Sequence, residues 1–163
     1  APWAILPTTP FTSGSSVRTF ARMRRSIAGS RRTRTFAVYA PTGTVSAASI
    51  GRRAGKAVDG VVLTATLFLA SRKQPGLSGF DFAAIASPLL FVHHVNDGCT
   101  YTPHSSARRL ADRYPLISVS GGAPEQSQPC DALSAHGFLG READTVGAIA
   151  KWMLKEPYPR EIN

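Results

Sequence analysis

Short apolar runs separated by longer polar segments constrain the fold of this chain more than any other feature of its sequence. The run Leu89–Val92 has the length and branching of a buried strand, and the polar cluster His93–Gly98 follows it directly. A second run, Leu116–Val119, stops at a pair of glycines. Between the two runs, residues 105–114 carry small and apolar side chains at helical spacing. Strand, helix and strand in this order predict neighbouring parallel strands in an α/β fold.

Two further apolar runs extend the predicted sheet towards the N-terminus. Both are rich in β-branched and aromatic residues, as strands are. We expect an α/β fold with about four mostly parallel strands, at roughly 35–40, 61–68, 89–94 and 116–120, and with flanking helices. Helices are predicted over 47–57 and 140–155. The apolar spacing in the second helix predicts a buried face made of Ala143, Val146, Ile149, Ala150 and Met153.

Polar side chains follow two of the predicted strands. Asp97 comes just after the run at Leu89, and His136 stands in the loop after the run at Leu116. Parallel strands end at the same edge of a sheet, where such folds place their active sites, so we expect the two side chains to lie near each other. Taken singly, Asp97 is also a common turn-capping residue and His136 a common surface histidine.

The motif around these two residues is specific in type and spacing. It consists of His93-His94, Asp97, Cys99, Thr102-Pro103, Ser120-Gly121-Gly122, Pro129-Cys130, Ser134, His136-Gly137-Phe138, Gly140 and Glu142. On these residues the chain resembles the α/β-hydrolases, particularly a bacterial branch with HH-x-x-D-x-C-x-x-TP, then SGG, then PC-x-x-x-S-x-HGF-x-G-x-E.

The resemblance implies a serine hydrolase that acts on a small-molecule ester or amide by acyl transfer to water. It implies that Asp97 is the triad acid and His136 the triad base, in the chain order nucleophile, acid, histidine. It calls for no cofactor and no metal. It also divides the chain into residues 1–34, a basic leader of uncertain structure, and residues 35–163, the C-terminal half of an α/β-hydrolase domain.

The expected nucleophile is missing from this pattern. The family elbow reads G-x-S-x-G, and Gly43 matches its last glycine, but Pro41 stands at the serine position and Tyr39 at the first glycine. Proline carries no hydroxyl, and its fixed φ does not suit the strained turn of the elbow. Ser46 is the nearest serine, yet we expect it inside the following helix; Thr42 and Thr44 are no better placed.

Two cysteines, Cys99 and Cys130, follow the two strands that precede Asp97 and His136. If they form a disulfide, the loops carrying acid and base are joined, and the chain belongs to an oxidising compartment, periplasmic or extracellular. Two free thiols in a cytoplasmic protein are the alternative. The His and Cys spacing matches no compact zinc motif, so we expect His93 and His94 to support the site rather than to bind metal.

Positive charge is concentrated near the N-terminus. The chain of 163 residues has a formal net charge of +9, yet all ten acidic residues lie at or after Asp59. Residues 17–34 contain seven arginines and a rough apolar stripe at helical spacing. A transit peptide, an arm binding nucleic acid, and an ordinary helix with solvated charges are three interpretations; nucleic acid is the less favoured partner because no aromatic interleaving accompanies the arginines.

A fourth interpretation is that residues 1–40 are truncated or translated out of frame, since their composition is also typical of a GC-rich gene read in a wrong frame. In the resembled family four strands precede the nucleophile strand, and the residues before position 35 leave no room for them. Two functional hypotheses therefore stay open. One is a hydrolase that is active in a longer form. The other is a catalytically inactive remnant that acts as a binding or dimerising module, completing an open sheet edge with a second copy. No apolar run reaches the roughly 20 residues of a membrane span.

Overall fold

The computed structural model describes residues 4–6, 19–27, 30–39, 43–72 and 74–163. Within these residues, seven strands form one sheet in sequence order. The strands are β1 (Ala4–Leu6), β2 (Thr19–Ile27), β3 (Ser30–Tyr39), β4 (Gly60–Thr64), β5 (Leu89–His94), β6 (Leu116–Val119) and β7 (Glu161–Ile162). The helices are α1 (Thr44–Ala54), α2 (His104–Arg108) and α3 (Glu142–Leu154), with short 3₁₀ turns η2 (Gly55–Ala57), η3 (Phe82–Ala84) and η4 (Ala135–Gly137).

The predicted parallel arrangement is confirmed for the four expected strands. β3, β4, β5 and β6 pair in parallel in that order, with Val62 opposite Leu90 and Val92 opposite Ile117. β7, which is not among the four predicted strands, adds a fifth parallel strand beside β6. β2 pairs with the other edge of this group in antiparallel fashion. Neither β3 nor β6 is therefore an edge strand: residues 36–38 of β3 and 118–119 of β6 have neighbouring strands on both sides.

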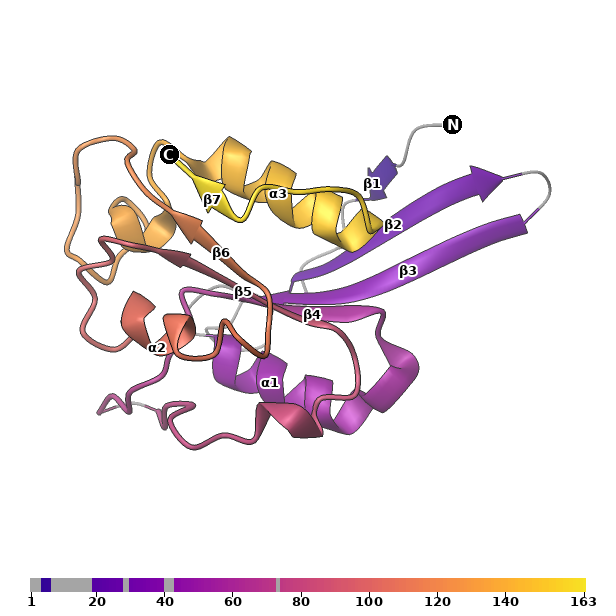
Figure 1. Ribbon diagram of the computed structural model, residues 1–163, viewed down its shortest axis with the longest axis horizontal. Coiled ribbons are helices and arrows are strands. Elements are labelled where there is room, and N and C mark those ends of the chain that lie inside the picture. The colour runs from indigo at the N-terminus through magenta and orange to yellow at the C-terminus, as the bar shows by residue number, and fades with distance from the viewer. Residues whose placement is uncertain (1–3, 7–18, 28–29, 40–42, 73) are drawn as a thin grey trace.

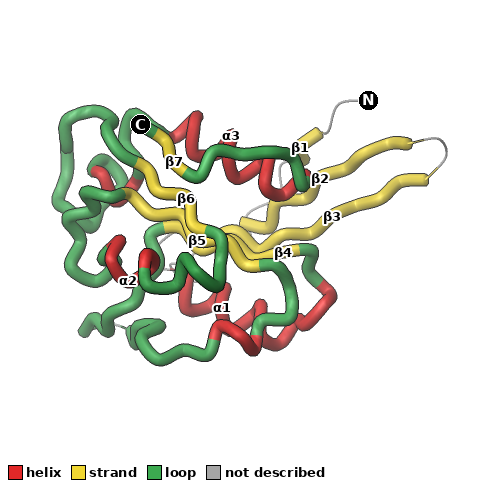
Figure 2. Tube along the Cα trace, in the orientation of Figure 1, coloured by secondary structure: helices red, strands yellow, loops and turns green. Residues whose placement is uncertain are grey.

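The sheet lies between two layers of helix. Figure 1 shows α1 and α2 on one face and α3 on the other, and Figure 2 shows the same arrangement along the Cα trace. Alternate residues of β4 and β5 point to opposite faces: Val61, Leu63 and Phe91 belong to the core beneath α1, while Val62 and Leu90 belong to the core beneath α3. Burial on both faces explains why these strands read as continuous apolar runs.

The described part of the basic segment is extended chain, so the predicted helical stripe over residues 17–34 is wrong. β2 and β3 form a long antiparallel pair, in which Thr19 lies opposite Val38 and Ile27 opposite Ser30. The physical reason is non-local. Residues 36–39 of β3 pair with β4, and β2 pairs with the other side of β3 from Ser30 to Val38. Pairing of this kind overrides a weak helical period. Residues 7–18 and 28–29 lie outside the described part of the chain.

β4 is shorter than the sequence predicted, ending at Thr64 rather than near residue 68. Ala65 has a φ of +41° and turns the chain out of the sheet, although its N–H still donates to the Val92 carbonyl. Side chains then replace the strand ladder: the N–H of Thr66 donates to His93 Nε2, and that of Leu67 donates to Thr44 Oγ1. A buried backbone needs these substitute partners once it leaves the sheet.

The buried face of α3 differs from the predicted one. Thr145, Ala148, Ile149 and Met153 are buried, whereas Val146 is 58% exposed. Ile149 and Met153 belong to both the predicted and the observed face. The helical period of 3.6 residues does not by itself decide whether Val146 or Ala148 lies beside them. Packing of the small Ala148 against the sheet decides it. No helix among the described residues is long and apolar enough to cross a membrane.

Alanine substitutions on α3 test which face is buried. Ile149→Ala should lower the free energy of unfolding by about 2 to 4 kcal/mol, because it removes a buried side chain and leaves a cavity. The matched control Val146→Ala should change it by less than about 0.5 kcal/mol, because this side chain is exposed. Urea unfolding followed by circular dichroism measures both. Equal losses for the two variants would contradict this orientation of the helix.

Candidate active site

Two loops at one edge of the sheet bring Asp97 and His136 together. Asp97 lies three residues beyond β5, in a turn in which its N–H donates to the His94 carbonyl. His136 lies in η4, on the long connection between β6 and α3. Its Nδ1 is 3.0 Å from Asp97 Oδ2 and 3.2 Å from Oδ1. Parallel pairing of β5 with β6 places both loops at the same edge, as the sequence predicted.

The carboxylate of Asp97 is enclosed and fully hydrogen-bonded. Its side chain is 0% exposed. Oδ1 accepts from the Cys99 N–H at 2.9 Å, and Oδ2 accepts from the Thr102 hydroxyl at 2.8 Å. Burial raises the pKa of Asp97, but the hydrogen bonds from His136, Cys99 and Thr102 outweigh this effect and hold the pKa below its ordinary value. The acid therefore stays ionised at neutral pH.

The imidazole of His136 is held in one orientation. An ionised carboxylate only accepts hydrogen bonds, so Nδ1 carries a proton, and in the neutral ring the lone pair is on Nε2. No described residue forms a hydrogen bond with Nε2. Ser134 Oγ accepts from the His136 N–H and donates to the Asp131 carbonyl, which fixes the turn that carries the ring. His136 is 4% exposed, so its position is set by packing as well.

Gly137 permits the tight turn after His136. A Cβ placed on Gly137 would lie 1.9 Å from the carbonyl oxygen of Ala132, a distance that no side chain tolerates. Phe138 next to it adopts a left-handed conformation with φ of +63° and is buried in the core under α3. The His-Gly-Phe sequence therefore combines a ring at the site, a close backbone approach and an anchor in the core.

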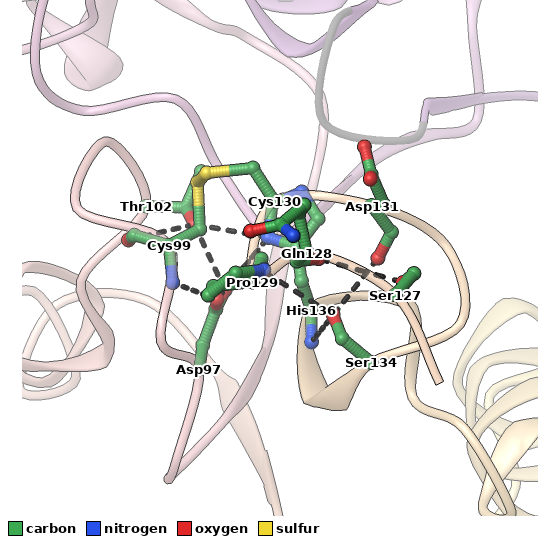
Figure 3. Close-up of a disulfide and its surroundings, with 10 residues drawn as sticks. All are labelled: Asp97, Cys99, Thr102, Ser127, Gln128, Pro129, Cys130, Asp131, Ser134 and His136. Carbon is green, nitrogen blue, oxygen red and sulfur yellow. Dashed lines mark hydrogen bonds and ion pairs between the residues drawn. A yellow bond between two sulfur atoms is a disulfide. The ribbon is translucent and has the colours of Figure 1, made fainter. Parts of the chain in front are cut away.

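A disulfide joins the two loops (Figure 3). Cys99 and Cys130 are bonded, with their Cα atoms 4.6 Å apart and a sequence separation of 31. Cys99 also donates its N–H to Asp97, and the carbonyl of Pro129, the residue before Cys130, lies 3.2 Å from Ser134 Oγ, a longer contact of the hydroxyl that donates to Asp131. One hydrogen bond therefore connects Cys99 to Asp97, and Ser134 connects the residue before Cys130 to His136. The predicted disulfide is confirmed, and the alternative of free thiols is wrong.

The paired histidines at the end of β5 support this edge of the sheet. His93 is 0% exposed, accepts the Thr66 N–H at Nε2 and stacks on Phe68 at 5.6 Å. Burial lowers the pKa of His93 to about 3, so the ring is neutral at neutral pH. His94 Nε2 donates to the Gly121 carbonyl at 2.9 Å, because its Nδ1 accepts from the Asn96 N–H. Both rings therefore tie loops together.

The hydroxyl groups considered as substitute nucleophiles lie elsewhere. Pro41 and Thr42 fall outside the described residues. Ser46 is exposed on α1, and no hydrogen bond joins it to His136 in the described structure. Thr44 is fully buried, and its oxygen accepts the Leu67 N–H, which is a structural role. None of the described hydroxyl groups considered as nucleophiles is therefore bonded to the Asp97–His136 pair, and the described residues contain no group of three or more His, Cys, Asp or Glu side chains that would hold a metal ion.

Sequence reasoning placed Thr102 and Ser134 in the motif but gave them no role. Their contacts with Asp97 and His136 depend on how two loops fold back on each other, and spacing alone carries no such signal. No protein-family model, curated protein or solved structure matches this chain. The fold and the site geometry are therefore the observations on which a functional assignment has to rest.

Removal of the disulfide should destabilise the fold. In the double variant Cys99→Ser/Cys130→Ser, the free energy of unfolding should fall by about 3 to 4 kcal/mol, because the unfolded chain regains the freedom of a loop whose ends are 31 positions apart. Urea unfolding with and without dithiothreitol measures the loss. The unaltered chain should lose stability on reduction while the double variant should not respond. Equal stability of both proteins under oxidising conditions would contradict the prediction.

The neutral, buried His93 makes stability depend on pH. Between pH 6.5 and about pH 3 the unfolded chain binds a proton at this ring and the folded chain does not. The free energy of unfolding should therefore fall as the pH falls through this window, by at most about 1.4 kcal/mol per pH unit. Urea unfolding at a series of pH values measures the slope.

His93→Gln should flatten that slope, since glutamine still offers an oxygen to the Thr66 N–H but does not titrate. His104→Gln is the matched control: burial also lowers the pKa of this half-buried histidine, so its removal should flatten the slope less. Asp97 adds a loss of the same sign at lower pH, because its lowered pKa favours the folded state until the carboxylate is protonated. An unchanged slope in His93→Gln would refute the assignment.

Proposed function

We propose that this chain carries the acid and the base of a serine-hydrolase site of the α/β-hydrolase type, acting on an ester or amide by acyl transfer to water. The observation that carries the proposal is the enclosed Asp97 carboxylate, 3.0 Å from His136 Nδ1, with no described residue bonded to Nε2. An imidazole oriented in this way presents a basic nitrogen away from its carboxylate partner, as the base of a hydrolase does.

In the proposed reaction each residue has one role. His136 Nε2 takes the proton of a hydroxyl as that hydroxyl attacks the carbonyl carbon of the substrate, and then gives it to the leaving alcohol or amine. A water molecule then attacks the acyl group on that hydroxyl oxygen by the same proton transfers, which releases the acid product and restores the hydroxyl. Asp97 keeps the Nδ1–H tautomer and stabilises the imidazolium, without taking the proton itself. The hydrogen bonds that keep Asp97 ionised suit it to this role.

The order of elements also supports the proposal. In the resembled family the nucleophile stands on a sharp turn between a strand and a helix, followed in the chain by the acid and then the histidine. Here residues 40–43 connect β3 to α1 in the chain, and Pro41 is among them. β3, β4 and β5 are neighbours, and Asp97 follows β5. Because Pro41 supplies no hydroxyl at the elbow position, we expect this chain to be inert as a hydrolase.

The disulfide supports a further part of the proposal, the compartment. A bond between Cys99 and Cys130 persists where thiols are not kept reduced. We therefore place the working protein in an oxidising compartment, the periplasm or the exterior of the cell.

Restoration of the elbow tests the function. The double substitution Tyr39→Gly/Pro41→Ser converts Tyr-Ala-Pro-Thr-Gly into the family pattern G-x-S-x-G while leaving Asp97 and His136 untouched. This variant should gain hydrolysis of p-nitrophenyl acetate and covalent labelling by a fluorophosphonate. Adding His136→Ala should lower the gained rate by about 10²- to 10⁴-fold, the usual contribution of general acid–base catalysis.

The matched control adds His104→Ala in place of His136→Ala and should keep the gained rate, since His104 bonds to Ser118 and to neither member of the pair. A double variant that folds but shows no turnover dependent on His136 would sink the hydrolase proposal. The second candidate would then stand: a non-catalytic module that binds a partner or a second copy of the chain, which the proline at position 41 favours.

A further inference from the structure

Thr102 lies between the disulfide loop and the acid–base pair. It is 1% exposed, and its N–H donates to the Cys99 carbonyl to close the turn that follows Asp97. The next residue, Pro103, is the N-cap of α2. The backbone of Thr102 is thus fixed on both sides, by a turn and by a helix. Figure 3 shows its side chain beside Cys99 and close to Asp97.

The hydroxyl of Thr102 contacts both members of the pair. Its Oγ1 is 2.8 Å from Asp97 Oδ2 and 3.1 Å from His136 Nδ1, and a third, longer contact of 3.4 Å reaches the Cys99 carbonyl. The contact with Oδ2 is the shortest of the three. It is also shorter than the 3.0 Å between Oδ2 and His136 Nδ1.

Counting protons assigns the direction of these bonds. A hydroxyl has one proton to donate, and an ionised carboxylate has none. Nδ1–H therefore donates towards Asp97, and the Thr102 hydroxyl donates to Oδ2 while its own lone pair faces Nδ1–H. The Cys99 N–H donates to Oδ1 and the Thr102 hydroxyl donates to Oδ2. Each carboxylate oxygen of Asp97 thus has one donor from the same turn, in addition to the imidazole of His136. The carboxylate can then neither rotate nor approach His136 differently without breaking one of these bonds.

We propose that Thr102 is a positioning residue of the acid–base pair, whose hydroxyl fixes the Asp97 carboxylate where it receives the His136 Nδ1–H. Its importance for turnover rests on the hydrolase function proposed above, but the contact itself does not. A purely structural role for Thr102, closing the turn through its backbone, would be kept by any residue of similar shape. Valine has that shape without the hydroxyl, and serine has the hydroxyl without the methyl group.

The ionisation of Asp97 separates the two roles. Loss of a hydrogen bond to the charged form raises a carboxyl pKa. We expect Thr102→Val to raise the midpoint of the Asp97 titration by about one pH unit, and Thr102→Ser to leave it within error of the unaltered chain. Carbon-13 NMR of the Asp97 carboxyl carbon follows the titration. The titratable neighbours of Asp97 are His136 and His93, whose pKa is about 3, and both are present in all three proteins. A difference in the Asp97 midpoint between the proteins therefore reports the change at Thr102.

An unchanged Asp97 midpoint in a folded Thr102→Val protein would overturn the proposal, as would an equal rise in Thr102→Ser. Circular dichroism establishes which variants fold. If Thr102→Val does not fold, a measurement on the unaltered chain decides. A buried hydroxyl held by a carboxylate exchanges slowly, so its proton should give a separate NMR signal with a nuclear Overhauser effect to the His136 ring. Absence of that signal would then count against the proposal.

Turnover gives a second readout that is independent of the titration. In the Tyr39→Gly/Pro41→Ser background, Thr102→Val should lower kcat for p-nitrophenyl acetate and leave KM nearly unchanged, and Thr102→Ser should restore kcat. If the background variant has no activity, the proposed function fails while the titration still tests Thr102. If the background is active and Thr102→Val changes KM alone, the residue does not position the pair.

Discussion

Enclosure of the Asp97 carboxylate is the constraint on which this end of the molecule depends. A charge removed from water costs several kcal/mol unless hydrogen bonds replace the lost solvent. Here the replacements come from the Cys99 N–H, the Thr102 hydroxyl and the His136 ring. They arise from two loops that are far apart in sequence, so neither loop can adopt another conformation without leaving the charge unpaired. The carboxylate therefore organises the loops as much as the loops position the carboxylate.

The sheet and the disulfide make this arrangement possible. Parallel pairing of β5 with β6 delivers both loops to one edge, and the bond between Cys99 and Cys130 keeps them at a fixed separation. Behind them, His93 and His94 connect the end of β5 to the segments after β4 and β6. The Asp97–His136 pair is thus supported by a covalent link on one side and by hydrogen-bonded imidazoles on the other. This degree of support is what a site requires when small displacements of its groups alter its chemistry.

Much of the arrangement was accessible from the sequence because its signals are local or follow from topology. Apolar runs such as Leu89–Val92 mark strands buried on both faces, and the order of strands and helices predicts parallel pairing. The proximity of Asp97 and His136 then follows from their places just beyond two strands. The predictions were wrong where a weak helical period competed with strand pairing or with packing against the sheet. The arginine-rich segment forms β2 because β3 needs a partner, and α3 turns Ala148 rather than Val146 towards the sheet.

The sequence by itself determined the layered α/β architecture and the parallel order of β3 to β6, since these depend on residue type, period and chain order. Its resemblance to a known family singled out Asp97 and His136 as the acid and base candidates. Tertiary structure decided between a disulfide and free thiols at Cys99 and Cys130, and it alone decided the neutral state of His93 and the contact of Thr102 with both Asp97 and His136. Each of these depends on burial or on distances between loops separated by about thirty residues. Desolvation and hydrogen-bond geometry act through space, and no pattern along the chain encodes them directly.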